Sequence, residues 1–332
     1  MILLFGMNMD IGIDLGTANT VVYVKRKGIV LREPSVVAIS RDKNKILAVG
    51  EEAKEMIGRA PGSIVLVQPL RDGVIADFNV TAGLIRHVID KVNGNSIAFR
   101  PRIMVCVPSG VTKVEERAVQ EAAEQAGART VWLIEEPLAA AIGAGLNINE
   151  PQGTMVVDIG GGTTDIAVIS LGAIAEKKSI KVGGYRFDAD ITSYVKNEYN
   201  LMIGERTTED LKEKVGAAFV GARDAKLEVR GRDIVSGLPN SVTVTSDQVA
   251  TAIEKSVTNI VNAIKDVLSA TNPELSADII DRGIVLTGGG ALLYGLDKLI
   301  TKETGLATFV ADDALDSVAL GCGKAIESGY GV

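Results

Sequence analysis

The pattern of hydrophobic and polar positions near the N-terminus predicts a β-hairpin. Ile11–Asp14 and Thr20–Lys25 have the composition of short strands, and the polar segment between them contains glycine and favours a turn. The same arrangement returns later in the chain, where Met155–Asp158 and Asp165–Ser170 flank three consecutive glycines. The sequence therefore predicts two similar hairpins, each with an aspartate at the end of its first strand.

The spacing of these aspartates indicates an internal duplication. Asp14 and Asp158 lie 144 positions apart, which is too far for a solenoid repeat but suits two homologous domains of one chain. Each half then continues with alternating strands and helices. In the first half, Ile103–Val107 has the apolar composition of a buried strand, and Val114–Ala126 has apolar residues at helical spacing. This alternation is typical of an α/β fold.

Further elements are expected around and after the boundary between the halves. Pro137–Gly143 predicts a helix, because proline is favoured in a first helical turn, and its small residues would let it pack tightly as a hinge. Val249–Leu268 has the apolar spacing of a long amphipathic helix. Ile284–Leu286 is expected to be a strand that enters the turn Gly288–Gly290, followed by a helix over Ala291–Thr301.

Two segments are more polar and less regular than the rest. Tyr199–Val244 is interpreted as a small inserted subdomain of the second half, and Arg32–Pro61 as its counterpart in the first half. Because no low-complexity linker separates these pieces, we expect the domains to be interleaved.

Composition narrows the class of protein. The 332 residues are 46% hydrophobic and 23% charged, enough to fill the cores of two domains. A net charge of -7 argues against a broad nucleic-acid-binding surface, so no nucleic-acid partner is expected. With only Cys106, Cys322 and His87 available, neither a disulfide framework nor a zinc site is expected, and His87 is assigned to a helix surface or core position. The chain has no apolar run of about 18 residues and no signal-peptide pattern, which favours the cytoplasm.

Three glycine-rich turns could bind phosphate, because glycine lets backbone amides approach an anion closely. One alone is weak evidence, but two matched hairpins could hold a polyphosphate from both sides. Asp14 and Asp158 would then hold a hydrated Mg²⁺, although they could instead only cap their turns. Neither a Walker A motif nor the protein-kinase motif set is present. The three turns are Gly16-Thr17-Ala18-Asn19, Gly160-Gly161-Gly162-Thr163 and Gly288-Gly289-Gly290.

These motifs resemble those of the actin, Hsp70 and sugar-kinase superfamily, and within it the chain resembles the MreB family of bacterial actin homologues along nearly its whole length. The two phosphate motifs are Asp10 to Thr20 and Asp158 to Asp165. Five further blocks also resemble MreB sequences: Glu33 to Ala38, Asp72 to Phe78, Val107 to Gly110, Ile134 to Pro137 and Arg282 to Gly290.

The resemblance implies an actin-like fold of class α/β. Two duplicated domains with ribonuclease H-like cores would flank a nucleotide cleft, each carrying a small inserted subdomain. The first half would span 9–145, with an insertion at about 32–65, and 315–332 would return to it. The second half would span 146–314, with an insertion at about 182–244.

The resemblance also implies catalytic roles in a slow ATPase that uses ATP and Mg²⁺. Glu136 matches the residue that polarises the attacking water, and Thr163 would assist it. Glu135 is the less favoured neighbour, and both glutamates could instead only charge the first turn of a helix.

Nucleoside contacts are implied by resemblance at three places. The turn that begins Gly183-Gly184 would lie on the adenosine side, and Glu209 and Lys212 would lie against the ribose and base. Gly289, Gly290, Ala291 and Leu292 would form the opposing adenine wall, with Gly288 before them. Tyr185 departs from the acidic residue often found in the family, which leaves the fine positioning of the nucleotide open.

Polymer and membrane contacts are also expected. The helix that contains Val114 would pair protofilaments, unless Val114 only packs on its own domain. The apolar residues Ile97-Ala98-Phe99, beside Arg100 and Arg102, resemble a membrane-inserting loop, although they could form a small satellite core. The apolar N-terminus, Met1–Phe5, could be a second foot on an anionic membrane or could pack on its own domain.

Taken together, the resemblance implies an ATP-dependent, membrane-associated cytoskeletal filament that maintains cell shape with cell-wall elongation proteins, peripheral on the inner face of the membrane. An Hsp70-like chaperone is the first alternative, but no peptide-binding domain follows the ATPase pattern. A sugar or acetate kinase is the second, but no distinct substrate motif is present.

Overall fold

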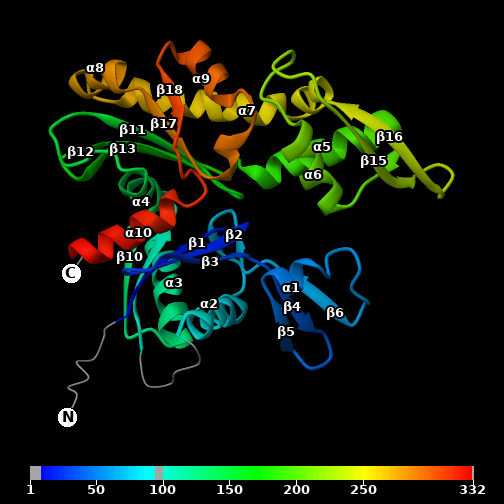
Figure 1. Ribbon diagram of the computed structural model, residues 1–332, viewed down its shortest axis with the longest axis horizontal. Coiled ribbons are helices and arrows are strands. Elements are labelled where there is room, and N and C mark those ends of the chain that lie inside the picture. The colour runs from blue at the N-terminus through cyan, green and yellow to red at the C-terminus, as the bar shows by residue number, and fades with distance from the viewer. Residues whose placement is uncertain (1–8, 94–99, 331–332) are drawn as a thin grey trace. The chain divides into compact units, whose positions relative to one another are not determined.

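The computed structural model describes residues 9–93 and 100–330 (Figure 1). Contacts between residues divide the chain into two units. Unit 1 comprises Met1–Ile148 and Leu315–Val332, and unit 2 comprises Asn149–Ala314. Each unit is built on one five-stranded sheet with helices packed against it.

The large sheet of unit 1 has the strand order β10-β9-β1-β2-β3. Strand β1 pairs antiparallel with β2, and β2 pairs antiparallel with β3. On its other side β1 pairs parallel with β9, which pairs parallel with β10. The strands are β1 Asp10–Leu15, β2 Asn19–Val24, β3 Gly28–Pro34, β9 Arg102–Val107 and β10 Thr130–Glu135.

The helices of unit 1 include α3, which the sequence predicted. It begins after a capping box formed by Thr112 and Glu115 and ends at Gly127, whose φ of 116° is left-handed. The C-terminal helix α10 approaches α4 so closely that a Cβ on Gly321 would lie 1.8 Å from the carbonyl oxygen of Ala139. The four main helices are α2 Phe78–Asn93, α3 Lys113–Ala126, α4 Glu136–Gly143 and α10 Ser317–Ser328.

The large sheet of unit 2 has the strand order β13-β12-β11-β17-β18. Its strands are β11 Thr154–Ile159, β12 Thr164–Ser170, β13 Ala173–Ile180, β17 Ile284–Thr287 and β18 Thr308–Val310. Its main helices are α5 Gly184–Tyr199, α7 Ser246–Ala270, α8 Pro273–Arg282 and α9 Leu296–Thr304.

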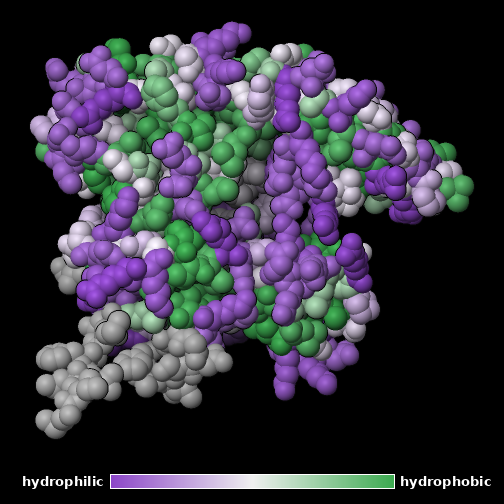
Figure 2. Space-filling view, viewed as in Figure 1, coloured by the Kyte–Doolittle hydropathy of each residue, from purple (hydrophilic) through white to green (hydrophobic). Residues whose placement is uncertain are grey.

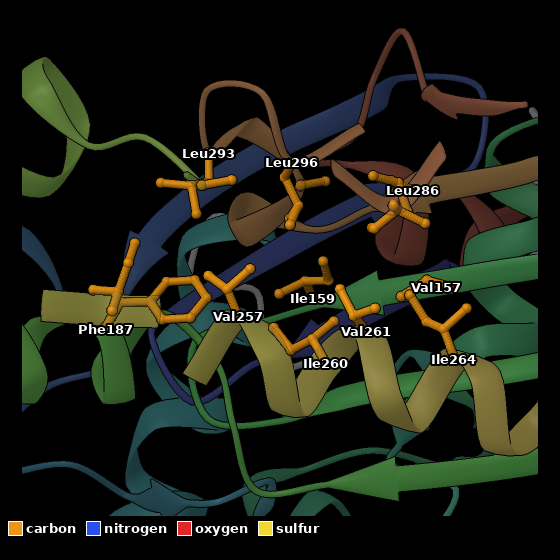
Figure 3. Packing of buried hydrophobic residues seen from close by; sticks show 14 of the residues in the cluster. Val157, Ile159, Phe187, Val257, Ile260, Val261, Ile264, Leu286, Leu293 and Leu296 are labelled. Atoms are coloured by element: carbon orange, nitrogen blue, oxygen red, sulfur yellow. The ribbon is translucent and has the colours of Figure 1, made fainter. Parts of the chain in front are cut away.

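The core of unit 2 forms where α7 packs on the large sheet. Figure 3 shows Val257, Ile260, Val261 and Ile264 on successive turns of α7, in one cluster with residues of β11 and β17. These four side chains are at most 4% exposed. Their spacing of three and four residues is the pattern from which the sequence predicts an amphipathic helix in this segment.

The two large sheets confirm the duplication. In each, an antiparallel three-stranded meander is followed by two strands that join parallel on the far side of its first strand. Each sheet also has a bulge between the second and third strands, beginning at Val22 in unit 1 and at Val168 in unit 2. Strands β1, β2, β3, β9 and β10 therefore correspond to β11, β12, β13, β17 and β18.

Each unit also has a small three-stranded sheet. In unit 1 it is β5-β4-β6, formed by Lys45–Val49, Val37–Ser40 and Ile64–Val67, with the short helix α1 at Glu51–Lys54. A two-stranded ladder, β7 Leu70–Arg71 with β8 Val74–Ile75, follows it.

The small sheet of unit 2 is β14-β15-β16, formed by Leu201–Met202, Lys226–Asp233 and Pro239–Thr245, and α6 spans Glu205–Val215. Hydrophobic residues gather at the tip of the β15–β16 hairpin (Figure 2), where Val235 is 84% exposed.

The predicted helix over Ala291–Thr301 is wrong in its bounds. The segment after β17 is only a four-residue 3₁₀ helix, η1 Gly289–Leu292, so the three glycines do not open an α-helix. Gly295 then adopts a left-handed φ of 78° and precedes α9, which runs from Leu296 to Thr304. A left-handed residue interrupts a right-handed helix, and the sequence pattern alone did not locate it.

Candidate nucleotide-binding site

The first glycine turn lies between β1 and β2 and is tightly built. A Cβ on Gly16 would lie 2.6 Å from the carbonyl oxygen of Asn19, so only glycine fits this turn without a shift. The carbonyl oxygens of Gly16 and Ala18 accept hydrogen bonds from Ser35, at 2.7 and 2.9 Å. Thr17 is buried, and its Oγ1 accepts a hydrogen bond of 3.2 Å from the backbone N–H of Gly73.

Asp14 lies at the end of β1, immediately before this turn, and is partly buried. The thiol of Cys106 donates a hydrogen bond to its Oδ1 at 3.3 Å. Burial raises the pKa of Asp14 to about 6, and the negative charge of Asp316 adds to the rise, whereas the Cys106 hydrogen bond lowers it. A nearby cation would favour the ionised form of this carboxylate, which burial disfavours.

Glu136 is buried at the first position of α4, directly after β10. Its negative charge and that of Asp14 both contribute to raising the pKa of the Cys106 thiol, after a hydrogen bond to Cys322 and burial. Asp14 and Cys106 are in hydrogen-bond contact, and the charge of Glu136 acts on the same thiol. The structure thus gathers a predicted metal ligand and the predicted water-orienting carboxylate around a buried thiol.

The second glycine turn lies between β11 and β12 and repeats the first. The N–H of Gly160 donates to the carbonyl oxygen of Thr163 at 2.9 Å, which closes the turn. Asp158, at the matching position of β11, is 5% exposed and accepts a hydrogen bond of 2.7 Å from Thr287 Oγ1 on its Oδ1. Thr163 is also buried.

The predicted adenosine-side turn is in direct contact with this second glycine turn. The N–H groups of Gly184 and Tyr185 donate to the carbonyl oxygens of Gly160 and Gly161, at 3.0 and 2.9 Å. A Cβ on Gly183 would lie 2.6 Å from the Gly160 oxygen, so this approach requires glycine. The first residues of α5 therefore bind the carbonyl groups of the second glycine turn.

Lys212 and Asp188 form an ion pair of 2.9 Å beside that turn, and Lys212 Nζ also donates to the Gly184 oxygen at 3.4 Å. Burial raises the pKa of Asp188, and the positive charge of Lys212 opposes the rise. The second oxygen of the carboxylate, Oδ1, is buried and has no hydrogen-bond partner among the described residues. A buried acceptor of this kind fits a ligand that brings a hydroxyl or amino donor.

Tyr185 lies close to the predicted nucleoside contacts. Partial burial raises its pKa to about 12, and the negative charges of Glu209 and Asp188 contribute. The tyrosine therefore stays neutral over the physiological pH range.

The predicted adenine wall packs against the second hairpin. Gly288 has a φ of 80°, and a Cβ there would lie 2.4 Å from the carbonyl oxygen of Ile159. A Cβ on Gly290 would lie 2.2 Å from Ile159 Cγ2. In η1 itself, the side chain of Ala291 is buried in the core, while that of Leu292 is 56% exposed.

The donor chemistry fits a hydrated Mg²⁺ better than a protein-caged metal. Across 9–93 and 100–330, no three His, Cys, Asp or Glu side chains are grouped so that they could hold a metal ion. Each hairpin instead places one carboxylate at the end of its first strand, directly before its glycine turn: Asp14 in unit 1 and Asp158 in unit 2. Single carboxylates combined with nucleotide phosphates and waters are the ligand set that Mg²⁺ commonly takes.

Sequence reasoning missed several residues of these turns. Ser35 lies inside a block that resembles MreB sequences, but no role is predicted for it, and no contact with Asp14 is predicted for Cys106. Thr287 stood just before a recognised glycine run. Only the three-dimensional pairing of β9 with β1 and of β17 with β11 brings Cys106 and Thr287 to the two aspartates.

The structure describes the predicted filament contact at Val114 but not the two predicted membrane segments. Val114 is 78% exposed on α3, so it does not pack on its own unit as the alternative required. Met1–Phe5 and Ile97–Phe99 lie outside the described residues. Within those residues, none of the helices combines the length and apolarity needed to cross a bilayer.

Sequence comparisons identify close relatives over nearly the whole chain. The family model described as MreB/Mbl protein matches residues 8–330. The chain is 55% identical over 319 residues to the cell shape-determining protein Mbl of Bacillus subtilis (strain 168), with 96% of each sequence covered. It is 51% identical over 323 residues to the cell shape-determining protein MreB of Escherichia coli (strain K12), covering 96% of this chain and 93% of the relative.

Solved structures agree with these sequence matches. MreB5 of Spiroplasma citri bound to ADP is similar with a TM-score of 0.92 and 38% identity, over 98% of both chains. The same protein bound to AMPPNP gives a TM-score of 0.91 and 39% identity, over 97% of this chain and 99% of that one. The MamK double helical filament, at 22% identity over 96% of this chain and 99% of that one, gives a TM-score of 0.82 and shows a likeness of fold alone.

Proposed function

Because the chain belongs to the MreB/Mbl family of cell shape-determining, actin-like cytoskeletal proteins, we propose that it binds ATP, hydrolyses it slowly and assembles into filaments. One observation carries this proposal. Two glycine turns, each preceded by an aspartate, occupy the same position in two sheets of the same topology. The relative MreB5 of Spiroplasma citri has been crystallised with ADP and with AMPPNP, which supports an adenine nucleotide as the ligand.

The first part of the proposal is that both turns contact the phosphates of one nucleotide. Gly16–Asn19 would contribute backbone N–H groups from unit 1, and Gly160–Thr163 would contribute them from unit 2. The buried Asp188 Oδ1 and the neighbouring Lys212 support a nucleoside contact at Gly183 and Gly184, with Glu209 beside them. Gly288–Leu292 would complete the adenine side, with the exposed Leu292 as its apolar surface.

The second part concerns the metal. Asp14 and Asp158 would hold Mg²⁺ through its waters, and Mg²⁺ would neutralise charge on the phosphates. The raised pKa of Asp14 supports this role, because a nearby cation would stabilise the ionised carboxylate that burial disfavours. Thr287 orients the carboxylate of Asp158 through its 2.7 Å hydrogen bond.

The third part is slow hydrolysis. We assign Glu136 to orienting the attacking water and accepting its proton, with Thr163 assisting from the second turn. The position of Glu136 supports this assignment, since it is buried and its charge acts on the Cys106 thiol that binds Asp14, whereas Glu135 ends strand β10.

The fourth part is assembly. An exposed valine on a well-capped helix is consistent with a contact between protofilaments, and Val114 on α3 is such a residue. A related solved structure is described as the MamK double helical filament, which supports filament formation by this fold. Contact with anionic membrane through Met1–Phe5, Ile97 and Phe99, and with cell-wall elongation proteins, remains part of the same proposal.

A sedimentation experiment tests the proposal as a whole. Purified protein is centrifuged with Mg²⁺ and ATP, with ADP, or without nucleotide, each with and without liposomes that contain anionic lipid. Phosphate release is followed in parallel. ATP-dependent pelleting that increases on liposomes is expected. Protein that stays in the supernatant with ATP, while phosphate appears only when a sugar is added, would instead assign the chain to the sugar-kinase class.

A further inference from the structure

Two threonines occupy equivalent positions at the glycine turns. Thr20 begins the paired part of β2 opposite Leu15, and Thr164 begins β12 opposite Ile159. On the other side, Thr20 lies opposite Glu33 of β3 and Thr164 opposite Ile180 of β13. The two hairpins can therefore be aligned residue by residue beyond the turns themselves.

Each threonine side chain forms a hydrogen bond with a residue just after the third strand of its sheet. Thr20 Oγ1 shares a hydrogen bond of 2.8 Å with Ser35 Oγ, two residues after Glu33. Thr164 Oγ1 donates to the carbonyl oxygen of Val182 at 2.7 Å, two residues after Ile180. Ser35 and Val182 are therefore equivalent by position.

The chain continues differently after these equivalent residues. In unit 2 helix α5 starts two residues after Val182, and its first N–H groups, from Gly184 and Tyr185, bind the carbonyl oxygens of the second turn. In unit 1 the chain enters the inserted sheet instead, where β4 begins at Val37. No helix N-terminus follows Ser35 among the described residues of this segment.

Ser35 performs in unit 1 the task that two helix amides perform in unit 2. Its hydroxyl donates to the Gly16 oxygen at 2.7 Å, and its N–H donates to the Ala18 oxygen at 2.9 Å. When the carbonyl groups of a turn are held on one side, its N–H groups face the other, which is the arrangement that binds anions.

Burial makes this contact sensitive to substitution. Ser35 is 1% exposed and Thr20 is fully buried. Water therefore has little access to replace a lost hydroxyl, and its removal would leave the Gly16 oxygen and the Thr20 hydroxyl without their partner.

The segment around Ser35 is anchored on its other side as well. Glu33 accepts a hydrogen bond of 3.1 Å from His87 Nε2 and an ion-pair contact from Lys91, both on α2. The Val36 oxygen accepts a 2.9 Å hydrogen bond from Gly50, which lies between β5 and α1 of the inserted subdomain. The segment from Glu33 to Val36 thus joins the first glycine turn to both α2 and the inserted sheet.

We propose that Ser35 is a positioning residue that holds the first glycine turn in its anion-binding shape and couples that shape to the inserted β5-β4-β6 subdomain. The claim that Ser35 holds the turn is argued from the hydrogen bonds of Ser35. The claim that this shape serves nucleotide binding rests on the proposed function. Ser35 does not touch the nucleotide in this scheme. It sets the direction of the N–H groups that do.

The test compares Ser35→Ala with the parent and with Ser256→Ala. Ser256 is a matched control because it is 2% exposed and donates its hydroxyl to Asp190, which lies on α5 but is not one of the α5 residues that bind the second glycine turn. Two quantities are measured: amide hydrogen exchange of 14–20 in nucleotide-free protein, and affinity for Mg²⁺-ATP. Ser35→Ala is expected to accelerate exchange in 14–20 and to weaken affinity about tenfold, roughly 1.4 kcal/mol, while Ser256→Ala changes neither.

A double substitution separates positioning from general destabilisation. Thr20→Val with Ser35→Ala should weaken Mg²⁺-ATP affinity by less than the product of the two single effects, because both variants break the same hydrogen-bond network. Unchanged exchange in 14–20 for Ser35→Ala, or equal effects of Ser256→Ala, would overturn the inference. If the parent binds no nucleotide but Ser35→Ala still accelerates exchange in 14–20, the proposed function fails and the role of Ser35 in holding the turn stands.

Discussion

The thiol of Cys106 donates a hydrogen bond to Asp14, with Sγ 3.3 Å from Oδ1. A thiol is a weak donor, but this one acts on a carboxylate that burial has already pushed toward its neutral form. The same thiol also interacts with Cys322 of α10, the C-terminal helix that packs on β1. Asp14, which precedes the first glycine turn, is therefore influenced by residues that are distant in the sequence.

Cys106→Ala is expected to raise the pKa of Asp14 further, because the hydrogen bond it removes stabilises the ionised carboxylate. Cys106→Ser replaces the thiol donor with a hydroxyl donor at the same position. It should leave the pKa of Asp14 near the parental value or lower it. Carboxyl-carbon NMR of the nucleotide-free protein measures the titration directly. Equal Asp14 titration curves for the alanine variant and the parent would show that the thiol has no influence.

Asp14→Asn is expected to stabilise the nucleotide-free protein at pH 7. The folded pKa of about 6 lies above the ordinary value of 3.8, so the ionised carboxylate costs the folded state free energy. That cost develops as the pH rises from about 4 to 6 and then stays constant. Removing it should increase the free energy of unfolding by about 1–3 kcal/mol.

Urea unfolding in EDTA at pH 4 and pH 7 measures this difference. The Asn variant should gain stability relative to the parent only at the higher pH. A variant that is less stable than the parent at pH 7 would mean that the carboxylate has a compensating partner in the folded state.

Glu136→Ala is expected to leave Mg²⁺-ATP affinity nearly unchanged and to slow hydrolysis by about 10²-fold or more, the usual effect of losing a general base. Single-turnover phosphate release measures the rate without interference from product release. Glu135→Ala is the matched control and should hydrolyse ATP at the parental rate. If the two variants exchange these phenotypes, the catalytic role belongs to Glu135.

Val114→Glu is expected to give single protofilaments from a normally folded chain. Because the side chain is 78% exposed, the substitution should change stability by no more than about 0.5 kcal/mol, whereas burying the new charge in an interface would be costly. Ile280→Glu on α8 is the control, since Ile280 is 66% exposed. Electron microscopy of polymerised samples should show pairs for the control. Pairs in Val114→Glu would place the interface elsewhere.

The actin-like α/β fold and the family were predictable from the sequence, and both are confirmed. Local signals sufficed for the hairpins, because Asp14 and Asp158 each precede a glycine turn within a single run of residues. They also sufficed for α7, whose apolar spacing is regular over its length. The break between η1 and α9 was not predictable, because glycine permits the left-handed backbone that Gly295 adopts but does not require it.

The candidate site was predictable only in part, for a physical reason. Residues that would touch a nucleotide lie in short motifs, so the sequence displays them together. The residues that position those motifs come from elsewhere: Ser35 from the exit of β3, Thr287 from β17 and Asp316 from the segment before α10. Their roles depend on strand pairing and helix packing, which cannot be deduced from the sequence around each residue.

Titration calorimetry of Mg²⁺-ATP tests whether both glycine turns bind one Mg²⁺-nucleotide, as we propose. The parent, Asp14→Ala and Asp158→Ala are compared, each with and without Mg²⁺. We expect one ATP per chain and an affinity weakened by roughly tenfold or more in either variant, with little further loss when Mg²⁺ is removed. Two ATP molecules per chain, or Mg²⁺-dependent affinity retained in both variants, would contradict it.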